Sequence, residues 1–127
     1  PSTNITDTII LDTLPPSSSA TSPAQVASLS FTVSWSGSDT LSGIASYDVQ
    51  YRVGAAGMWA GWLSGTTAIS ATFGPGTPVA VTPGETYYFR VRAHDGAGNL
   101  EAYPGGDGDT HTFIAESFPV FLPFVKR

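Results

Sequence analysis

Cysteine is absent from this chain of 127 residues, which excludes disulfide bonds, thiolate metal sites and cysteine nucleophiles. A secreted domain of this length does not need disulfides to fold, so the absence does not argue against an extracellular protein. Charge is also scarce, because 12% of the residues are charged where about a quarter is usual. Solubility therefore has to come from serine, threonine, glycine and asparagine, a composition that suits extracellular β-modules.

Basic residues are the scarcest charged group. Five lysines and arginines stand against ten acidic residues, for a net charge of −5, and two of the five are Lys126 and Arg127. Nucleic-acid binding needs clustered basic side chains on phosphates, so we expect no nucleic-acid partner. The longest apolar run is too short to cross a bilayer, so we expect no membrane span. The chain opens on Pro1, which leads us to expect a processed or excised piece of a secreted or cell-surface protein.

Strand periodicity is strong along the chain, and helical periodicity is not seen. The clearest segment is residues 86–94, where Tyr87, Phe89, Val91 and Ala93 alternate with polar residues, the pattern of a strand with one buried face. Similar short segments recur between turn signals roughly every ten residues. This spacing predicts a single all-β domain, an antiparallel β-sandwich of about seven strands.

The predicted sandwich occupies residues 27–115, with an extension at each end. Residues 1–26 are expected to hold an N-terminal strand and a Pro/Ser-rich linker that forms no regular element. Residues 116–127 form an apolar tail whose prolines exclude a helix. The tail could close its own domain as an edge strand, or either extension could complete the sheet of a neighbouring copy. The apolar residues predicted for such self-association are Ile5, Ile9, Ile10, Leu11, Phe118, Val120, Phe121, Leu122, Phe124 and Val125.

Three segments of the body carry a family resemblance: VSW at 33–35, YDVQYR at 47–52 and PGETYYFRVRA at 83–93. Together they resemble the fibronectin type III module, a branch of the immunoglobulin-like β-sandwiches. The resemblance implies that Trp35 is a core residue and that Tyr87 forms a tyrosine corner. The loops look closest to Ig-like repeats of bacterial secreted and cell-surface proteins. The ending, residues 120–125, is similar to the C-terminal tails of extracellular proteins from filamentous thermophilic bacteria.

The sequence contains no convincing catalytic constellation. His94 and His111 are the only histidines, and no serine lies in a G-x-S-x-G motif. No glycine-rich loop precedes a helix, so a phosphate cradle is not expected either. We therefore predict a protein that is not an enzyme.

Acidic and amide side chains gather in two loops that an Ig-like sandwich places at the same end. Oxygen ligands of this kind, mixed with flexible glycines, can bind calcium, which would be the protein's only cofactor. The alternative is that each residue caps its own turn. The candidate calcium ligands are Asp39, Asp95, Asn99, Glu101, Asp107 and Asp109.

Two tryptophans, Trp59 and Trp62, form the other candidate site. Exposed aromatic rings can stack on sugars, which predicts a carbohydrate-binding surface. The alternative is that one or both rings belong to the aromatic core.

Two functions remain open from the sequence. In the first, the chain is a non-catalytic extracellular structural or interaction module that assembles with itself into a fibre through its terminal segments. In the second, it is a spacer or a carbohydrate- or protein-binding module of a larger secreted enzyme or adhesin. The expected partners are accordingly the protein itself or other extracellular proteins.

Overall fold

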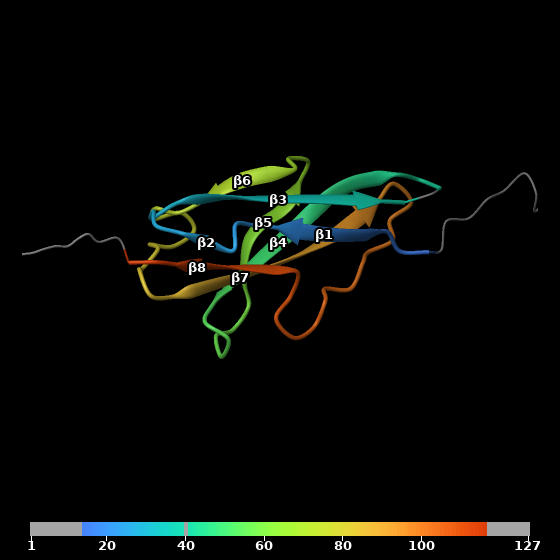
Figure 1. Ribbon diagram of the computed structural model, residues 1–127. Helices are drawn as coiled ribbons and strands as arrows, with labels where there is room; N and C mark the ends of the chain where they lie inside the picture. The colour runs from blue at the N-terminus through green and yellow to red at the C-terminus, as the bar shows by residue number, and fades with distance from the viewer. Residues whose placement is uncertain (1–13, 40, 117–127) are drawn as a thin grey trace, which may run out of the picture.

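The computed structural model of the protein describes residues 14–39 and 41–116. Within these residues the chain forms eight strands and no helix. One sheet has the order β1-β3-β6 and the other the order β2-β8-β7-β4-β5, and Figure 1 shows the two layers. The predicted all-β sandwich is therefore confirmed, with one strand more than expected. The strands are β1 (Ser17–Thr21), β2 (Gln25–Val26), β3 (Phe31–Ser38), β4 (Ile44–Val53), β5 (Ala60–Thr66), β6 (Ser70–Phe73), β7 (Thr86–Asp95) and β8 (Thr110–Ile114).

Strand β7 is the centre of the five-stranded sheet, as its alternation predicts. It pairs antiparallel with β4 on one side and with β8 on the other. Its side chains alternate between half-buried and buried positions along its whole length, and Phe89, Val91 and Ala93 are completely buried. A period of two puts every second side chain on the same face of a sheet, so the sequence pattern alone determines which face of β7 enters the core.

The expectation that the Pro/Ser-rich stretch after residue 14 forms no regular element is wrong. Residues Ser17–Thr21 are strand β1, which pairs antiparallel with β3 from Ser17↔Ser38 to Thr21↔Ser34. Serine has little strand propensity by itself, but an unpaired edge of β3 can be satisfied by the backbone of any extended segment. Backbone pairing, which does not depend on the side chains, therefore overrides the composition here.

The core between the sheets is a cluster of aromatic rings around Phe73. Phe73 is completely buried, and its ring lies 4.8 Å from that of Phe89 and 5.3 Å from that of Tyr87, measured between centroids. Trp35 is buried beside Trp62 and donates a hydrogen bond from Nε1 to the Ala68 carbonyl at 2.8 Å. The core role that the family resemblance implies for Trp35 is thus confirmed.

Tyr87 closes a turn at the start of β7. Its ring is buried, and its hydroxyl accepts a hydrogen bond from the Thr82 N–H at 2.8 Å and lies 3.5 Å from the Ala80 carbonyl. Gly84 in the intervening Pro-Gly turn has a φ of 91°, which a residue with a Cβ rarely adopts. This is the tyrosine corner that the resemblance implies.

We expect the Tyr87→Phe substitution to lower the free energy of unfolding by about 1 kcal/mol, because it removes one hydrogen bond and leaves the buried ring in place. Chemical denaturation measures the change. The matched control is Tyr88→Phe, on the opposite face of the same strand, which should change stability by less than about 0.5 kcal/mol. Equal losses in the two variants would contradict a special role for the Tyr87 hydroxyl.

The two ends of the described chain lie at opposite ends of the long axis of the sandwich. Figure 1 shows the blue start of the chain entering β1 from one end, and the orange-red end of β8 leaving at the other. The connection between β7 and β8 is the long one: it runs across the side of the sandwich from residue 96 to residue 109. It contains five of the six candidate calcium ligands or lies next to them.

Candidate functional site

The β3–β4 loop and the start of the β7–β8 connection meet at one end of the sandwich, as predicted. The Gly96 N–H donates to the Gly43 carbonyl at 3.1 Å. Within this end, however, Asp39 turns to its own loop, where Oδ1 accepts hydrogen bonds from the N–H groups of Leu41 and Ser42 at 3.0 Å each. Asp39 therefore caps its own turn.

Asp95 organises the loop that follows β7. Its side chain is buried, and Oδ1 accepts hydrogen bonds from the N–H groups of Ala97 and Asn99 at 3.0 and 2.7 Å. Its Oδ2 accepts a third bond, from the Asn99 side-chain amide at 2.9 Å. Gly98, with a φ of 91°, lets the chain close this tight loop. Asp95 and Asn99 therefore cap their own turn, as the alternative to a calcium site predicts.

Glu101 and Asp109, which we call the carboxylate pair, join the two sheets along the side of the sandwich. Glu101 accepts from the Ser18 N–H of β1 at 3.1 Å and from the Ala93 N–H of β7 at 3.0 Å. Asp109 accepts from the Val91 N–H at 2.9 Å and from the backbone of Ala20. Each carboxylate thus satisfies one N–H from each sheet where no neighbouring strand does so.

The surroundings of Asp109 disfavour its charge. Burial raises the pKa of Asp109, the hydrogen bond from Val91 acts in the opposite direction, and the charge of Glu101 raises the pKa further. The two carboxylates therefore repel each other while both hold backbone N–H groups. Their position is explained by bonding to strands, with no cation required.

The structure does not bring the six candidate calcium ligands together. Among residues 14–39 and 41–116, no group of three or more His, Cys, Asp or Glu side chains could hold a metal ion. Asp107 is turned to a different partner, Arg52 Nη2, at 2.7 Å. The sequence pattern suggested a shared site because all six residues lie in loops, but each side chain is bound by its own turn, strand or salt bridge.

A row of stacked cations and rings covers the outer face of the five-stranded sheet, and we call it the arginine–aromatic row. It contains every arginine of the described part of the chain. Neighbouring members stack with guanidinium carbons 4.3 to 4.8 Å from ring centroids. The members are Arg52, Arg90, Arg92, Trp59, Tyr88 and Tyr103.

Arg90 lies at the middle of the row. Its guanidinium is 4.3 Å from the Trp59 ring and 4.6 Å from the Tyr103 ring, and its Nε donates to Gln50 Oε1 at 2.7 Å. Burial lowers the pKa of Arg90 and raises the pKa of Tyr103. Arg90 and Arg92 are both half-buried, and Tyr103 of the β7–β8 connection stacks on both guanidinium groups.

Arg52 continues the row toward the far end of the sheet. It is buried between the rings of Trp59 and Tyr88, at 4.8 and 4.7 Å, and it pairs with the exposed carboxylate of Asp107. Trp59 precedes β5, and Tyr103 and Asp107 belong to the β7–β8 connection. The row therefore fastens the β4–β5 loop and the β7–β8 connection onto the sheet.

Asp48 ends the row beside Arg92. It is buried, and its Oδ2 accepts from Arg92 Nε at 2.9 Å and lies 2.8 Å from His94 Nε2. Its Oδ1 accepts from the Gly65 N–H at 2.8 Å. Burial by itself raises the pKa of Asp48, yet the hydrogen bonds from His94, Gly65 and Arg92 outweigh it and hold the pKa below its ordinary value.

Sequence reasoning missed the role of Asp48. It alternates with the inward residues Tyr47 and Val49, a pattern that indicates only that Asp48 lies on the outward face of β4. The signal that could have found it is cross-strand charge pairing, since Asp48 lies opposite Arg92 in the register of β4 and β7. That register is not visible in either segment alone.

Trp59 and Trp62 do not form one surface. Trp62 packs inward against Trp35, Phe73 and Phe89, with ring centroids 5.2 to 6.1 Å apart, whereas Trp59 stacks on the arginines outside. Residues three apart on an extended segment point to opposite faces. The core alternative therefore holds for Trp62, and sugar stacking at Trp59 stays a prediction.

We expect the Trp59→Ala substitution to lower the free energy of unfolding by about 1–2 kcal/mol, because two cation–π contacts are lost. Denaturant titration measures the change, and Met58→Ala, at a side chain that is 89% exposed, should stay within about 0.5 kcal/mol of the parent. A Trp59→Ala protein of unchanged stability that lost retention on polysaccharide would instead make Trp59 a ligand-binding residue.

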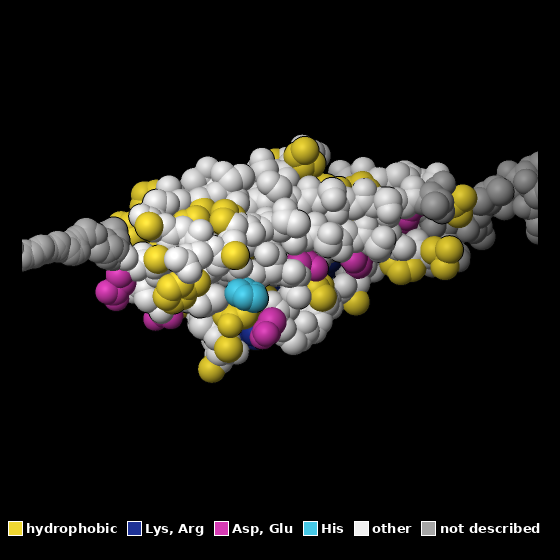
Figure 2. All heavy atoms as spheres, viewed as in Figure 1, with side chains coloured by type: hydrophobic (Ala, Val, Ile, Leu, Met, Phe, Trp, Pro, Cys, Tyr) yellow, Lys and Arg dark blue, Asp and Glu magenta, His cyan; other side chains and the backbone are white. Residues whose placement is uncertain are grey.

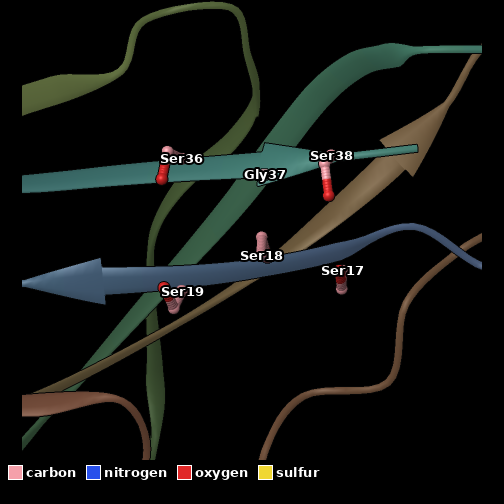
Figure 3. Close-up of a pocket in the computed structure, with 6 residues that line it drawn as sticks. All are labelled: Ser17, Ser18, Ser19, Ser36, Gly37 and Ser38. Carbon is pink, nitrogen blue, oxygen red and sulfur yellow. The ribbon is translucent and has the colours of Figure 1, made fainter. Parts of the chain in front are cut away.

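The outer face of the three-stranded sheet is chemically different, because hydroxyl side chains cover it. Ser17, Ser19 and Thr21 of β1 are exposed beside Ser36 and Ser38 of β3, and the surface over these strands is largely white in Figure 2. Figure 3 shows the two strands side by side with these serines. Small side chains leave a hollow of about 310 Å³ there, lined by Ser17, Ser18, Ser19, Ser36, Gly37 and Ser38.

The sequence model of the fibronectin type III domain matches residues 15–104. The chain belongs to the fibronectin type III family. The match begins before β1, so the fibronectin type III domain includes the Ser-rich strand that the sequence pattern left in a linker. Domains of this family are structural or interaction modules, are often spacers in larger proteins, and are generally non-catalytic.

Comparison with solved structures gives a more distant similarity. The chain is similar to the "Twitchin kinase region from C.elegans (Fn31-NL-kin-CRD-Ig26)", with 18% sequence identity and a TM-score of 0.46. The similarity covers 68% of this chain and 14% of that chain. No curated protein matches the sequence.

The last two predictions from the sequence concern a membrane span and self-association. Among the described residues, no helix has the length and apolarity that crossing a membrane requires. The ten apolar residues predicted for self-association lie within positions 5–11 and 118–125, outside the described residues.

Proposed function

We propose that this fibronectin type III domain is a non-catalytic, extracellular structural module whose copies join end to end through their terminal segments. The single observation that supports it is the placement of the two ends of the described chain at opposite ends of the sandwich. A contact between the N-terminal segment of one copy and the C-terminal segment of the next would be heterologous. Heterologous contacts build open filaments when their rotation does not close a ring.

The sandwich between the two ends is held together as a rigid body. Two sheets pack over a continuous aromatic core, and the carboxylate pair ties one sheet to the other. The arginine–aromatic row fastens the β4–β5 loop and the β7–β8 connection onto the five-stranded sheet. Few charges and many hydroxyls on the surface, together with the absence of cysteine, are compatible with a location outside the cell. Antibody labelling of intact producing cells tests the location, and signal only after lysis would contradict it.

Light scattering of the native chain tests the assembly. We expect a mass that grows with protein concentration for the full chain, and a monomer after removal of residues 1–13 or of residues 117–127. Both truncations keep every described strand, so melting curves close to that of the full chain are the control. A full chain that stays monomeric at high concentration contradicts end-to-end assembly.

The second candidate is a spacer in a larger secreted protein, and the same observation supports it. When the chain enters a module at one end and leaves it at the other, the neighbouring domains are held apart by the length of the module. A monomeric full chain with an unchanged melting curve after truncation favours this candidate over the filament.

A further inference from the structure

Strand β1 contributes few side chains to the core. Of its five side chains only Ala20 is buried, while Ser17, Ser19 and Thr21 are exposed. An alanine buries far less apolar area than the valine, leucine or phenylalanine side chains that contribute about 1.5–3 kcal/mol each. Pairing with the backbone of β3 therefore supplies most of what holds β1 in the sheet.

The other edge of β1 is held by side chains and not by another strand. Its N–H groups at Ser18 and Ala20 point away from β3 and are accepted by Glu101 and Asp109. The Ser18 hydroxyl also donates to Glu101, at 2.5 Å. Because these carboxylates come from the β7–β8 connection, two side chains tie this edge of β1 to the second sheet. Release of β1 has to break these contacts and the five-residue pairing with β3, but no other strand pair.

The chain immediately after β1 is anchored much more firmly. Thr112 of β8 is completely buried, and its hydroxyl bonds to Ser22 Oγ at 2.7 Å and to the Pro23 carbonyl at 2.6 Å. The Ser22 hydroxyl also lies 3.0 Å from that of Thr110. A weakly packed strand ending at a fixed point can pivot there as a unit.

Release of β1 would uncover a template for strand addition. Strand β3 is eight residues long, its side chains Phe31, Val33 and Trp35 are buried in the core, and it also pairs with β6 on its other edge. Its uncovered N–H and C=O groups would need a partner strand. The strand that fits there passes close to Gly37, where an added Cβ would lie 2.8 Å from the Ser17 carbonyl oxygen and 3.0 Å from the Ser18 Cβ. A strand with small side chains in the register of β1 meets this requirement.

We propose that β1 pivots at Ser22 and Pro23 and pairs with β3 of a second copy of this chain. Exchange re-forms the same pairing between copies that it breaks within one, so the exchanged pair carries no new unsatisfied groups. The partner's carboxylate pair receives the Ser18 and Ala20 N–H groups in the same way. The contact lies on the side of the sandwich and uses neither terminal segment, so it goes beyond the proposed end-to-end assembly.

The absence of cysteine permits a direct test in the full-length protein. Ser19 and Ser36 are register partners, at a separation that a disulfide can bridge across antiparallel strands. Single variants Ser19→Cys and Ser36→Cys, differently tagged, are mixed and oxidised at equal concentration. We expect about ten times more cross-linked heterodimer than from Ser19→Cys mixed with Ser64→Cys, an exposed position on β5.

Equal heterodimer yields in the two mixtures would overturn the proposal. The double variant Ser19→Cys/Ser36→Cys should close its disulfide within one chain at high dilution, and failure to do so would overturn the register on which the proposal rests. Deleting residues 117–127 should leave the heterodimer yield unchanged, whereas it abolishes end-to-end assembly. The two proposals can therefore fail separately.

A second substitution tests the release step. We expect Glu101→Gln to raise the rate of heterodimer formation about tenfold, because a charged acceptor that holds β1 is lost. The matched control is Glu85→Gln, at an exposed position just before β7. The same rate for both variants would show that the carboxylate pair does not restrain β1, and would overturn the pivot.

Discussion

Replacing Phe73 with alanine is expected to lower the free energy of unfolding by about 3–5 kcal/mol, the largest loss we predict for a single substitution. The side chain is completely buried at the centre of the core. Its removal would leave a cavity that the rings around it, fixed in two different sheets, cannot fill. Chemical denaturation at equilibrium measures the loss. The rings in contact with Phe73 are Phe31, Tyr51, Trp62, Tyr87 and Phe89.

Two further variants make this result specific to the core. Thr72→Ala changes the exposed neighbour on the same strand and should alter stability by less than about 0.5 kcal/mol. Phe73→Leu keeps an apolar side chain and should lose about 1–2 kcal/mol, since most of the volume remains filled. If Phe73→Ala lost no more than Thr72→Ala, the arrangement of rings around position 73 would be incorrect.

The second large effect is expected at Asp48, where alanine should lower the free energy of unfolding by about 2–3 kcal/mol. The substitution removes the acceptor for Gly65 and Arg92 and the partner of His94. Hydrogen bonds to a charged group contribute about 1.5–3 kcal/mol, and partial exposure of Arg92 and His94 limits the cost of leaving them unpaired. A matched loss of charge, Asp39→Ala at an exposed turn, should have a smaller effect.

The Asp48 network also predicts how stability depends on pH. Because the pKa of Asp48 is lower in the folded chain than the ordinary 3.8, its contribution to stability is present above that pH and is lost as the pH falls through the folded value. The difference in stability between the parent and Asp48→Asn should therefore shrink below pH 3.8. The raised pKa of Asp109 acts in the opposite direction, but Asp109 is present in both proteins. Its effect on stability therefore cancels in the difference between them. A constant difference from neutral to acid pH would contradict the lowered pKa.

The features of the fold that could be predicted from the sequence are those that depend on neighbouring residues. The buried face of β7 was predicted correctly, because a period of two acts over neighbouring residues. The corner at Tyr87 was implied by the family resemblance of residues 83–93, and the structure confirms it. Strand β1 was missed, because its serines carry no such pattern and its pairing depends on β3, which follows it in the chain. The turn-capping alternative for Asp39 and Asp95 was available from sequence for the same local reason.

The sequence by itself determined the class of the fold, the family and the inward faces of the central strands. Only the tertiary structure decided what the polar residues do. Glu101 reaches β1 across 83 residues of sequence, and Asp48 finds Arg92 through the register of β4 and β7. Burial follows from the alternation within one strand, whereas a hydrogen bond between distant segments exists only once the sheets have packed. For that reason only the tertiary structure shows that Glu101 and Asp109 join β1 to β7.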